Sequence, residues 1–221
     1  MNGNSSKQVL LSVLGIAVLV VAVVGVSFAF FTYSKAGTEN NTLTTGSIFF
    51  NFTEGQAITL TDQFPVSDSV GQSLTAAEGD NAVLTFSVVG YDGSGTGIDY
   101  EVKASQGAAV DTKTRMKDSE IKLLLSTTAS GVTNNYSTPK AVGADGSLAT
   151  GVTLATGKIT ATDSDSQQTD TYTLRMWITS DVVSIDETET PGDGDSVYTS
   201  TEFANLFYSL KLQVNAHTTG A

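Results

Sequence analysis

The chain has 221 residues, enough for one domain with a sizeable hydrophobic core. It carries 23 acidic against 11 basic side chains, a net charge of -12 that repels nucleic acid, so we expect no nucleic-acid partner. It contains no cysteine, which excludes disulfides and thiolate metal sites. Only 15% of the residues are charged, and small β-compatible residues are abundant, a composition typical of β-sheets with polar outer faces.

An apolar run extends from Val9 to Val26, behind the single cation Lys7. At about 1.5 Å per residue, a helical run of this length reaches roughly 27 Å, close to the thickness of a bilayer core. Two interpretations stay open. The run is either a signal peptide that is removed or a transmembrane helix that anchors the chain with Lys7 on the cytoplasmic side. Both place the bulk of the chain outside the cell or at its surface.

The residues after the run favour cleavage. Ser27 and Ala29 are small residues at the two positions that a signal peptidase reads, so the mature chain is expected to begin at Phe30. We therefore divide the chain into residues 1–29, a signal peptide or transmembrane helix, residues 30–43, an extended linker, and residues 44–221, the folded domain.

From Thr44 onward, short segments of alternating apolar and polar residues are separated by Gly, Asp, Asn and Ser. The expected strands are Ser47 to Phe52, Ala57 to Thr61, Ala82 to Val89, Ile98 to Ala104, Glu120 to Ser126, Val152 to Thr160, Thr171 to Thr179 and Phe207 to Ala216. A flexible loop is expected over residues 90–97, a tight turn over 143–146, and one short helix near Ser200 to Leu206. The pattern predicts an all-β fold, an antiparallel β-sandwich or jelly roll preceded by an N-terminal hydrophobic helix.

One side chain stands out in this pattern. Tyr172, Leu174, Met176 and Ile178 alternate toward one face of their strand, which places Trp177 on the opposite face. A tryptophan on an outer face needs a neighbouring segment or a partner to cover it.

The sequence offers little for catalysis. The only histidine is His217, the fifth residue from the C-terminal end. A single histidine at this place is a poor candidate for the base of a serine or threonine nucleophile, and it leaves no histidine pair for zinc. We therefore assign no catalytic, cofactor-binding or metal-binding residue and expect a protein that is not an enzyme. Acidic loops at Asp163 to Asp165, Asp186 to Glu189 and Asp193 to Asp195 have the oxygen ligands that calcium prefers, although solvated loop charge is the stronger interpretation.

The junction from Ser27 to Phe50 resembles the start of the TasA and camelysin family of secreted bacterial proteins, which have archaeal relatives that form pili. In that family the apolar segment ends in an Ala-Phe or Tyr-Phe step and continues with a Thr or Asp. A strand with the pattern Thr-x-Gly-x-Ile/Leu follows about 15 residues later. The matching residues here are Ala29, Phe30, Phe31 and Thr32, and then Thr45, Gly46, Ser47 and Ile48.

This resemblance implies a jelly-roll subunit with a SipW-type signal peptide, which assembles into a fibre by β-strand addition. By analogy, Phe30 to Leu43 is the donor segment, anchored by Phe30, Phe31 and Tyr33. Aromatic residues at 30–33 are equally typical of the interfacial end of an uncleaved membrane helix. The expected function is thus a structural subunit of an extracellular fibre or biofilm matrix that associates with itself. The alternatives are a membrane-anchored surface binding domain and, third, an exported hydrolase.

Overall fold

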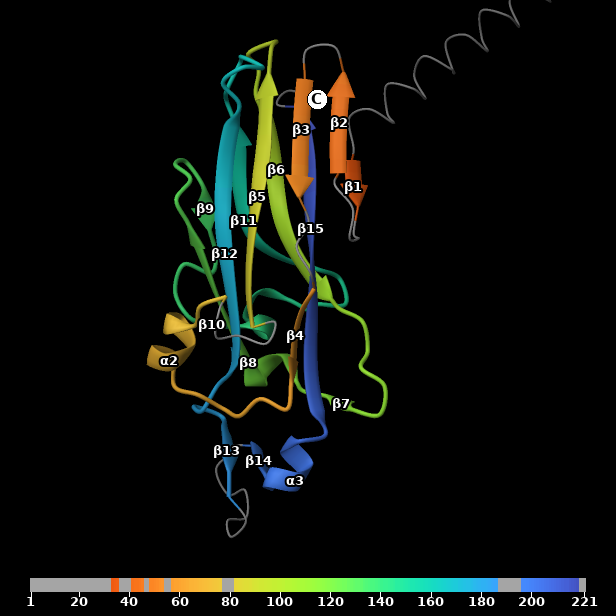
Figure 1. The fold of residues 1–221 in the computed structure, drawn as a ribbon, viewed down its shortest axis with the longest axis vertical. Coiled ribbons are helices and arrows are strands. Elements are labelled where there is room, and N and C mark those ends of the chain that lie inside the picture. The colour runs from red at the N-terminus through yellow and green to blue at the C-terminus, as the bar shows by residue number, and fades with distance from the viewer. Residues whose placement is uncertain are drawn as a thin grey trace, which may run out of the picture.

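The computed structural model describes residues 33–35, 41–45, 48–53, 57–76, 82–186 and 196–218, with side chains from residue 57 onward. Two β-sheets, here called sheet A and sheet B, lie face to face and run along the long axis of the molecule (Figure 1). The expected N-terminal hydrophobic helix falls outside the described residues.

Sheet A has seven strands in the order β1-β15-β6-β11-β9, with β4 and β7 also paired to β15. Its strands are β1 (Tyr33–Lys35), β4 (Ile58–Thr61), β6 (Ile98–Gln106), β7 (Thr114–Arg115), β9 (Thr133–Asn134), β11 (Val152–Ile159) and β15 (Leu206–Thr218). All its pairings are antiparallel except that of β7 with β15.

Sheet B has six antiparallel strands in the order β10-β8-β12-β5-β3-β2. They are β2 (Asn41–Thr45), β3 (Ile48–Thr53), β5 (Val83–Asp92), β8 (Ile121–Thr127), β10 (Lys140–Ala141) and β12 (Gln168–Ile178). The parallel pair β13 (Val183–Ile185) and β14 (Ser196–Tyr198) forms the base of the molecule with helix α3 (Ser200–Phe203).

The core follows from strand alternation. In β15 the residues Tyr208, Leu210, Leu212, Val214 and Ala216 are buried, as their spacing of two predicts. The inward rows of the two sheets merge into one continuous apolar cluster between them. The all-β, antiparallel fold predicted from the sequence is confirmed, and all eight expected strands are present within a few residues of their predicted ends.

The local predictions were less accurate. Strand β5 runs on to Asp92 and takes up the first residues of the expected loop. At the expected turn over 143–146, the structure has a 3-10 helix, Val142–Asp145, with Gly146 as its C-cap. Helix α3 ends at Phe203, three residues before the expected end at Leu206, and Thr199 caps it through a reciprocal capping box with Glu202.

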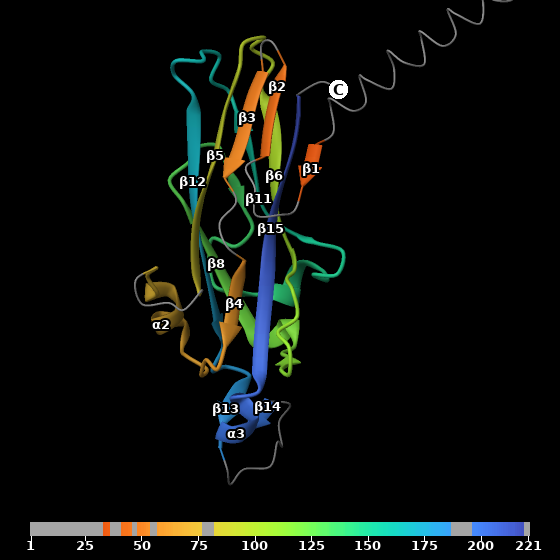
Figure 2. The same cartoon turned by 45° about the vertical axis from the view of Figure 1, so that its right-hand side comes forward.

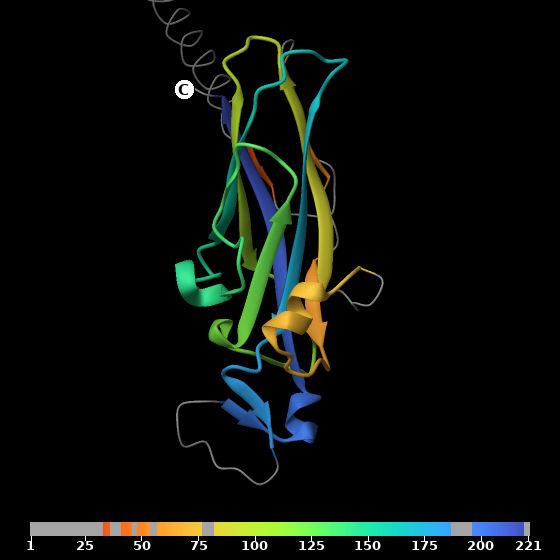
Figure 3. The ribbon, with the colours of Figure 1, turned by 90° about the vertical axis from the view of Figure 1, so that its left-hand side faces the viewer.

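Helix α2 (Asp68–Ser73) lies on the outer face of sheet B (Figure 3). It covers Trp177, which is only 2% exposed. The helix reaches the indole ring through Gly71, where a Cβ atom would fall far inside van der Waals contact with the ring. Lys122, the cross-strand neighbour of Trp177, forms ion pairs with Asp68 of the helix and with Asp181. An intramolecular helix is therefore the cover that the outward tryptophan needed.

Replacing Gly71 with alanine should displace α2. Helix propensity alone predicts that alanine stabilises this position by about 1 kcal/mol, whereas the clash with the indole predicts a loss of about 1–3 kcal/mol. We expect the clash to prevail, with a lower free energy of unfolding and a red-shifted emission from Trp177, the only tryptophan of the chain. Gln72→Ala, on the exposed side of the same helix, is the control and should change neither. An emission spectrum unchanged in Gly71→Ala would contradict this packing.

A buried carboxylate organises the loop between β5 and β6. Asp92 is fully buried and accepts hydrogen bonds from the Ser94 hydroxyl (2.6 Å) and backbone N–H (2.9 Å), and from the Thr96 hydroxyl (2.9 Å) and the Gly97 N–H (2.6 Å). Burial by itself raises the pKa of Asp92, but these four donors outweigh it and lower the pKa to about 2.

This depressed pKa predicts a pH-dependent contribution to stability. Because the folded state favours the Asp92 carboxylate, its contribution is complete above the ordinary aspartate pKa near 4 and is lost as the pH falls toward 2. Asp92→Asn should cost about 1–3 kcal/mol at pH 7, because an amide cannot accept all four hydrogen bonds. Urea unfolding of the parent protein and of Asp92→Asn between pH 2 and pH 7 measures the free energy of unfolding of each. The difference between the two values should shrink below pH 4. A difference that stays constant over this range would be inconsistent with the carboxylate's role.

Candidate functional site

The outer edge of β15 is the feature that connects the structure to the expected donor segment. One edge of β15 pairs with β6 from Leu210 to Thr218. The other edge is covered in two pieces: β4 pairs with Phe207–Leu210, and β1 pairs with Val214–Ala216. Among the described residues, no strand pairs with this edge at 211–213. Two short N-terminal strands therefore complete sheet A at this side (Figure 2).

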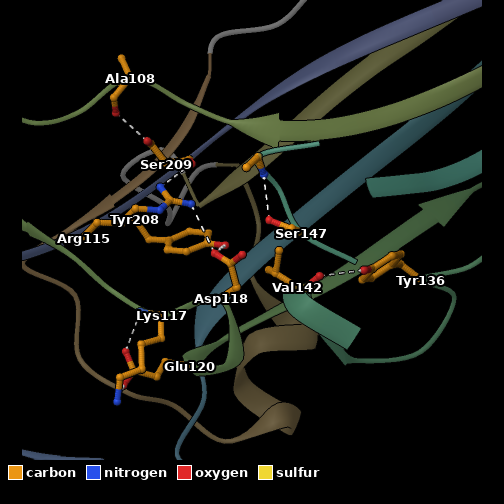
Figure 4. Close-up of polar contacts among 11 residues, drawn as sticks. Ala108, Arg115, Lys117, Asp118, Glu120, Tyr136, Val142, Ser147, Tyr208 and Ser209 are labelled. Carbon is orange, nitrogen blue, oxygen red and sulfur yellow. Dashed lines mark hydrogen bonds and ion pairs between the residues drawn. The ribbon is translucent and has the colours of Figure 1, made fainter. Parts of the chain in front are cut away.

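The lower half of β15 is held by many side-chain contacts. The guanidinium of Arg115 lies 4.1 Å from the centre of the Tyr208 ring and donates a hydrogen bond to the Ser209 carbonyl (3.1 Å), while the Tyr208 hydroxyl donates to Asp118 (2.8 Å) (Figure 4). The Ser209 hydroxyl also donates to the Ala108 carbonyl (2.6 Å). Burial, followed by the hydrogen bond to Asp118, raises the pKa of Tyr208, so its hydroxyl stays a donor. This half of the strand is a fixed scaffold.

The upper half of the edge is covered by β1, of which the structure describes the backbone. Strand β1 contributes three residue pairs, with Tyr33 opposite Ala216, Ser34 opposite Asn215 and Lys35 opposite Val214. Tyr33, one of the three expected anchors, thus lies on the edge of sheet A in its own chain. The other two anchors, Phe30 and Phe31, and the expected cleavage residues Ser27 and Ala29 lie outside the described residues.

The opposite side of sheet A is closed by side chains. Strand β9 pairs with only two residues of β11, Ala155 and Thr156. Beyond them, Asn135 binds the carbonyls of Leu154 and Thr153 through its backbone and side-chain N–H groups (2.9 and 3.1 Å).

Gln168 closes the far end of β11. Its amide oxygen accepts from the Thr160 N–H (2.8 Å) and its amide nitrogen donates to the Lys158 carbonyl (2.9 Å), the two groups that a neighbouring strand would bind. A side-chain amide thus takes the place of a neighbouring strand at the end of β11, which leaves little room for an added chain there.

A buried polar cluster joins the two sheets near this end. The Tyr100 hydroxyl of sheet A lies 2.5 Å from the Asp170 carboxylate and 2.6 Å from the Tyr172 hydroxyl of sheet B. Gln168 donates to the same carboxylate (3.0 Å). Burial raises the pKa of Tyr100, reinforced by the hydrogen bond to Asp170, and burial raises that of Tyr172 to about 12. Both tyrosines remain protonated, and the cluster fixes the spacing of the sheets.

Two open grooves, of about 470 and 420 Å³, flank this cluster and share Gly131 and Lys158. The first contains Gln168 and Asp170, and the second contains Asp99 and His217. Within the described parts of the chain, no three His, Asp or Glu side chains are grouped closely enough to hold a metal ion. The two grooves contain hydrogen-bonding groups, but their geometry assigns them no reaction.

The acidic loops remain an untested prediction for calcium. Asp163 and Asp165 are exposed, and the Asp163 carboxylate accepts a hydrogen bond from the Asp165 N–H (2.8 Å). Asp186 is the last described residue before a gap, so the acidic residues from 187 to 195 lie outside the described residues.

Comparison with known proteins leaves the family open. The chain matches no family model, no curated protein and no solved structure. In the part of the chain that the structure covers, none of the helices has the length and apolar character to cross a bilayer. The likeness to the TasA and camelysin family therefore stays a prediction from the junction residues. Sequence reasoning missed Asn135 and Gln168, because amides that replace a strand carry no periodic signal.

Removing the Gln168 amide should destabilise this side of sheet A. Gln168→Ala leaves the Thr160 N–H and the Lys158 carbonyl without their protein partner and takes a donor from Asp170, a loss of about 2 kcal/mol. Gln167→Ala changes the exposed neighbour and should stay within about 0.5 kcal/mol of the parent protein. Urea unfolding measures both values. Equal stabilities for the two variants would refute the role of Gln168.

Proposed function

We propose that the chain is a non-catalytic structural subunit of an extracellular fibre, pilus or biofilm matrix, exported by its N-terminal apolar segment and assembled by β-strand addition. The observation that carries the proposal is the pairing of β1 with β15. A strand of three residues, which follows the apolar run closely, completes an otherwise fixed edge of sheet A.

Such a strand can exchange at low cost. Each backbone hydrogen bond contributes about 0.5–1.5 kcal/mol net, so three residue pairs hold β1 by only a few kcal/mol. The same hydrogen bonds form again when the β1 of one copy binds the β15 edge of the next, as in domain swapping. Because donor and acceptor are different surfaces, the contact is head-to-tail, and repeated exchange leads to a filament.

The rest of the chain supports a structural role. The sandwich, which we propose to be of the jelly-roll type, is held by one continuous core and by the interlayer cluster around Asp170. The proposal requires no cofactor. Its partner is a second copy of the same chain, and the membrane takes part during export.

A cross-linking experiment tests the proposal. The chain lacks cysteine, so Tyr33→Cys in one copy and Ala216→Cys in another can form a disulfide only with these introduced cysteines. The Cα atoms of opposite residues in an antiparallel ladder lie about 4.5–5.5 Å apart, which is within the range of Cα separations that a disulfide can span. We expect mixed dimers when the two variants are co-expressed, exported and oxidised, and a ladder of covalent oligomers when both cysteines are in one chain. Tyr33→Cys with Ser164→Cys, in an exposed loop, is the control.

Filament formation provides the second measurement. Replacing residues 33–35 by three prolines should abolish filaments in negative-stain images, whereas three threonines, which retain strand pairing, should preserve them. The intact mass of the exported product should correspond to a chain that begins at Phe30. A full-length monomer in detergent, with only intramolecular disulfides in the double variant, would refute assembly by β1 and favour a membrane-anchored surface domain.

A further inference from the structure

The four outer edges of the two sheets are not equally protected. Natural sheets prevent unwanted pairing by short edge strands, charged side chains, prolines, bulges or a covering segment. In sheet A, β1 and β4 cover the β15 edge, and β9 with Asn135 and Gln168 covers the β11 edge. In sheet B, the β10 edge is two residues long and carries Lys140, which is paired with Asp145 (2.5 Å).

In the part of the chain that the structure describes, the fourth edge, β2, shows none of these protections. It is five residues long, pairs in unbroken register with β3, and contains no charged residue and no proline. Among the described residues, no strand pairs with its outer side, since β2 ends the order of sheet B. The whole stretch from Asn40 to Thr53, which includes β2 and β3, is free of charge.

The charge of the molecule indicates which partner fits this edge. Two copies, each with a net charge of -12, repel each other over most of their surfaces, and an uncharged edge is where they can approach. An antiparallel edge is also self-complementary, because a two-fold axis places each donor opposite an acceptor of the same strand in the other copy. A second copy of this chain therefore satisfies both the charge and the hydrogen-bonding pattern.

We propose that β2 is a two-fold self-association edge, at which sheet B of one copy continues antiparallel into sheet B of a second copy. The contact is isologous and closes on itself, so it yields pairs of molecules rather than chains. It uses a different sheet from the β1 exchange and does not depend on filament formation.

A cysteine scan tests this proposal directly. Near a two-fold axis through an antiparallel pair, a residue faces its own symmetry mate, so a single cysteine can bond to its copy. Asn41→Cys, Thr42→Cys, Leu43→Cys, Thr44→Cys and Thr45→Cys are made one at a time in the full-length, otherwise cysteine-free chain and oxidised in detergent. We expect at least one position to form disulfide dimers at least tenfold faster than Ser164→Cys, an exposed loop control.

Lysines introduced into β2 should prevent the proposed self-association. Thr42→Lys with Thr44→Lys should convert dimers to monomers in sedimentation, whereas Ser164→Lys with Ser166→Lys adds the same charge in the exposed loop and should leave the dimers intact. Unchanged Trp177 emission shows that each variant is folded. Cross-linking no faster than the control at all five positions would overturn the proposal, even if filaments form. Dimers without filaments would support it while refuting the proposed fibre.

Discussion

Backbone hydrogen bonding at the edges of the two sheets is the constraint on which the molecule depends. Strand β15 needs partners on both sides, and β6 supplies only one of them. The chain completes the other side with β4 and β1, drawn from segments far away in sequence. The amides of Asn135 and Gln168 do the same for β11. The stability of the sheets and the assembly that we propose therefore depend on the same backbone groups.

The two halves of β15 differ in a way that suits assembly. Around Tyr208 and Ser209 the strand contacts Arg115, Asp118 and the Ala108 carbonyl, so side-chain contacts hold this half in addition to the pairing at its edge. Around Val214–Ala216 three residue pairs hold β1. The strand exchange that we propose requires an acceptor edge that is already formed when the donor arrives, and it is favoured by a donor strand that is held through few residue pairs.

Strand alternation was sufficient to predict most of the sandwich, because a sheet with one buried face repeats every two residues. It failed where contacts are non-periodic. The two-residue strands β7, β9 and β10 are too short to show a period, and α2 was missed because its six residues have little helical pattern. Trp177 did signal that a cover was needed, but only the structure identifies Gly71 as its contact. Of the expected site, the structure describes Tyr33 alone, at the β15 edge.

Hydrogen exchange at the amides of β1 is the most direct test of a weakly held strand on a fixed edge. In the monomeric protein, we expect the amides of Tyr33–Lys35 to exchange by local opening, at least a hundredfold faster than those of β12 in the centre of sheet B, and to become protected in filaments. Protection of β1 equal to that of β12 in the monomer would show that the strand opens only on global unfolding, and would contradict exchange of β1 between copies.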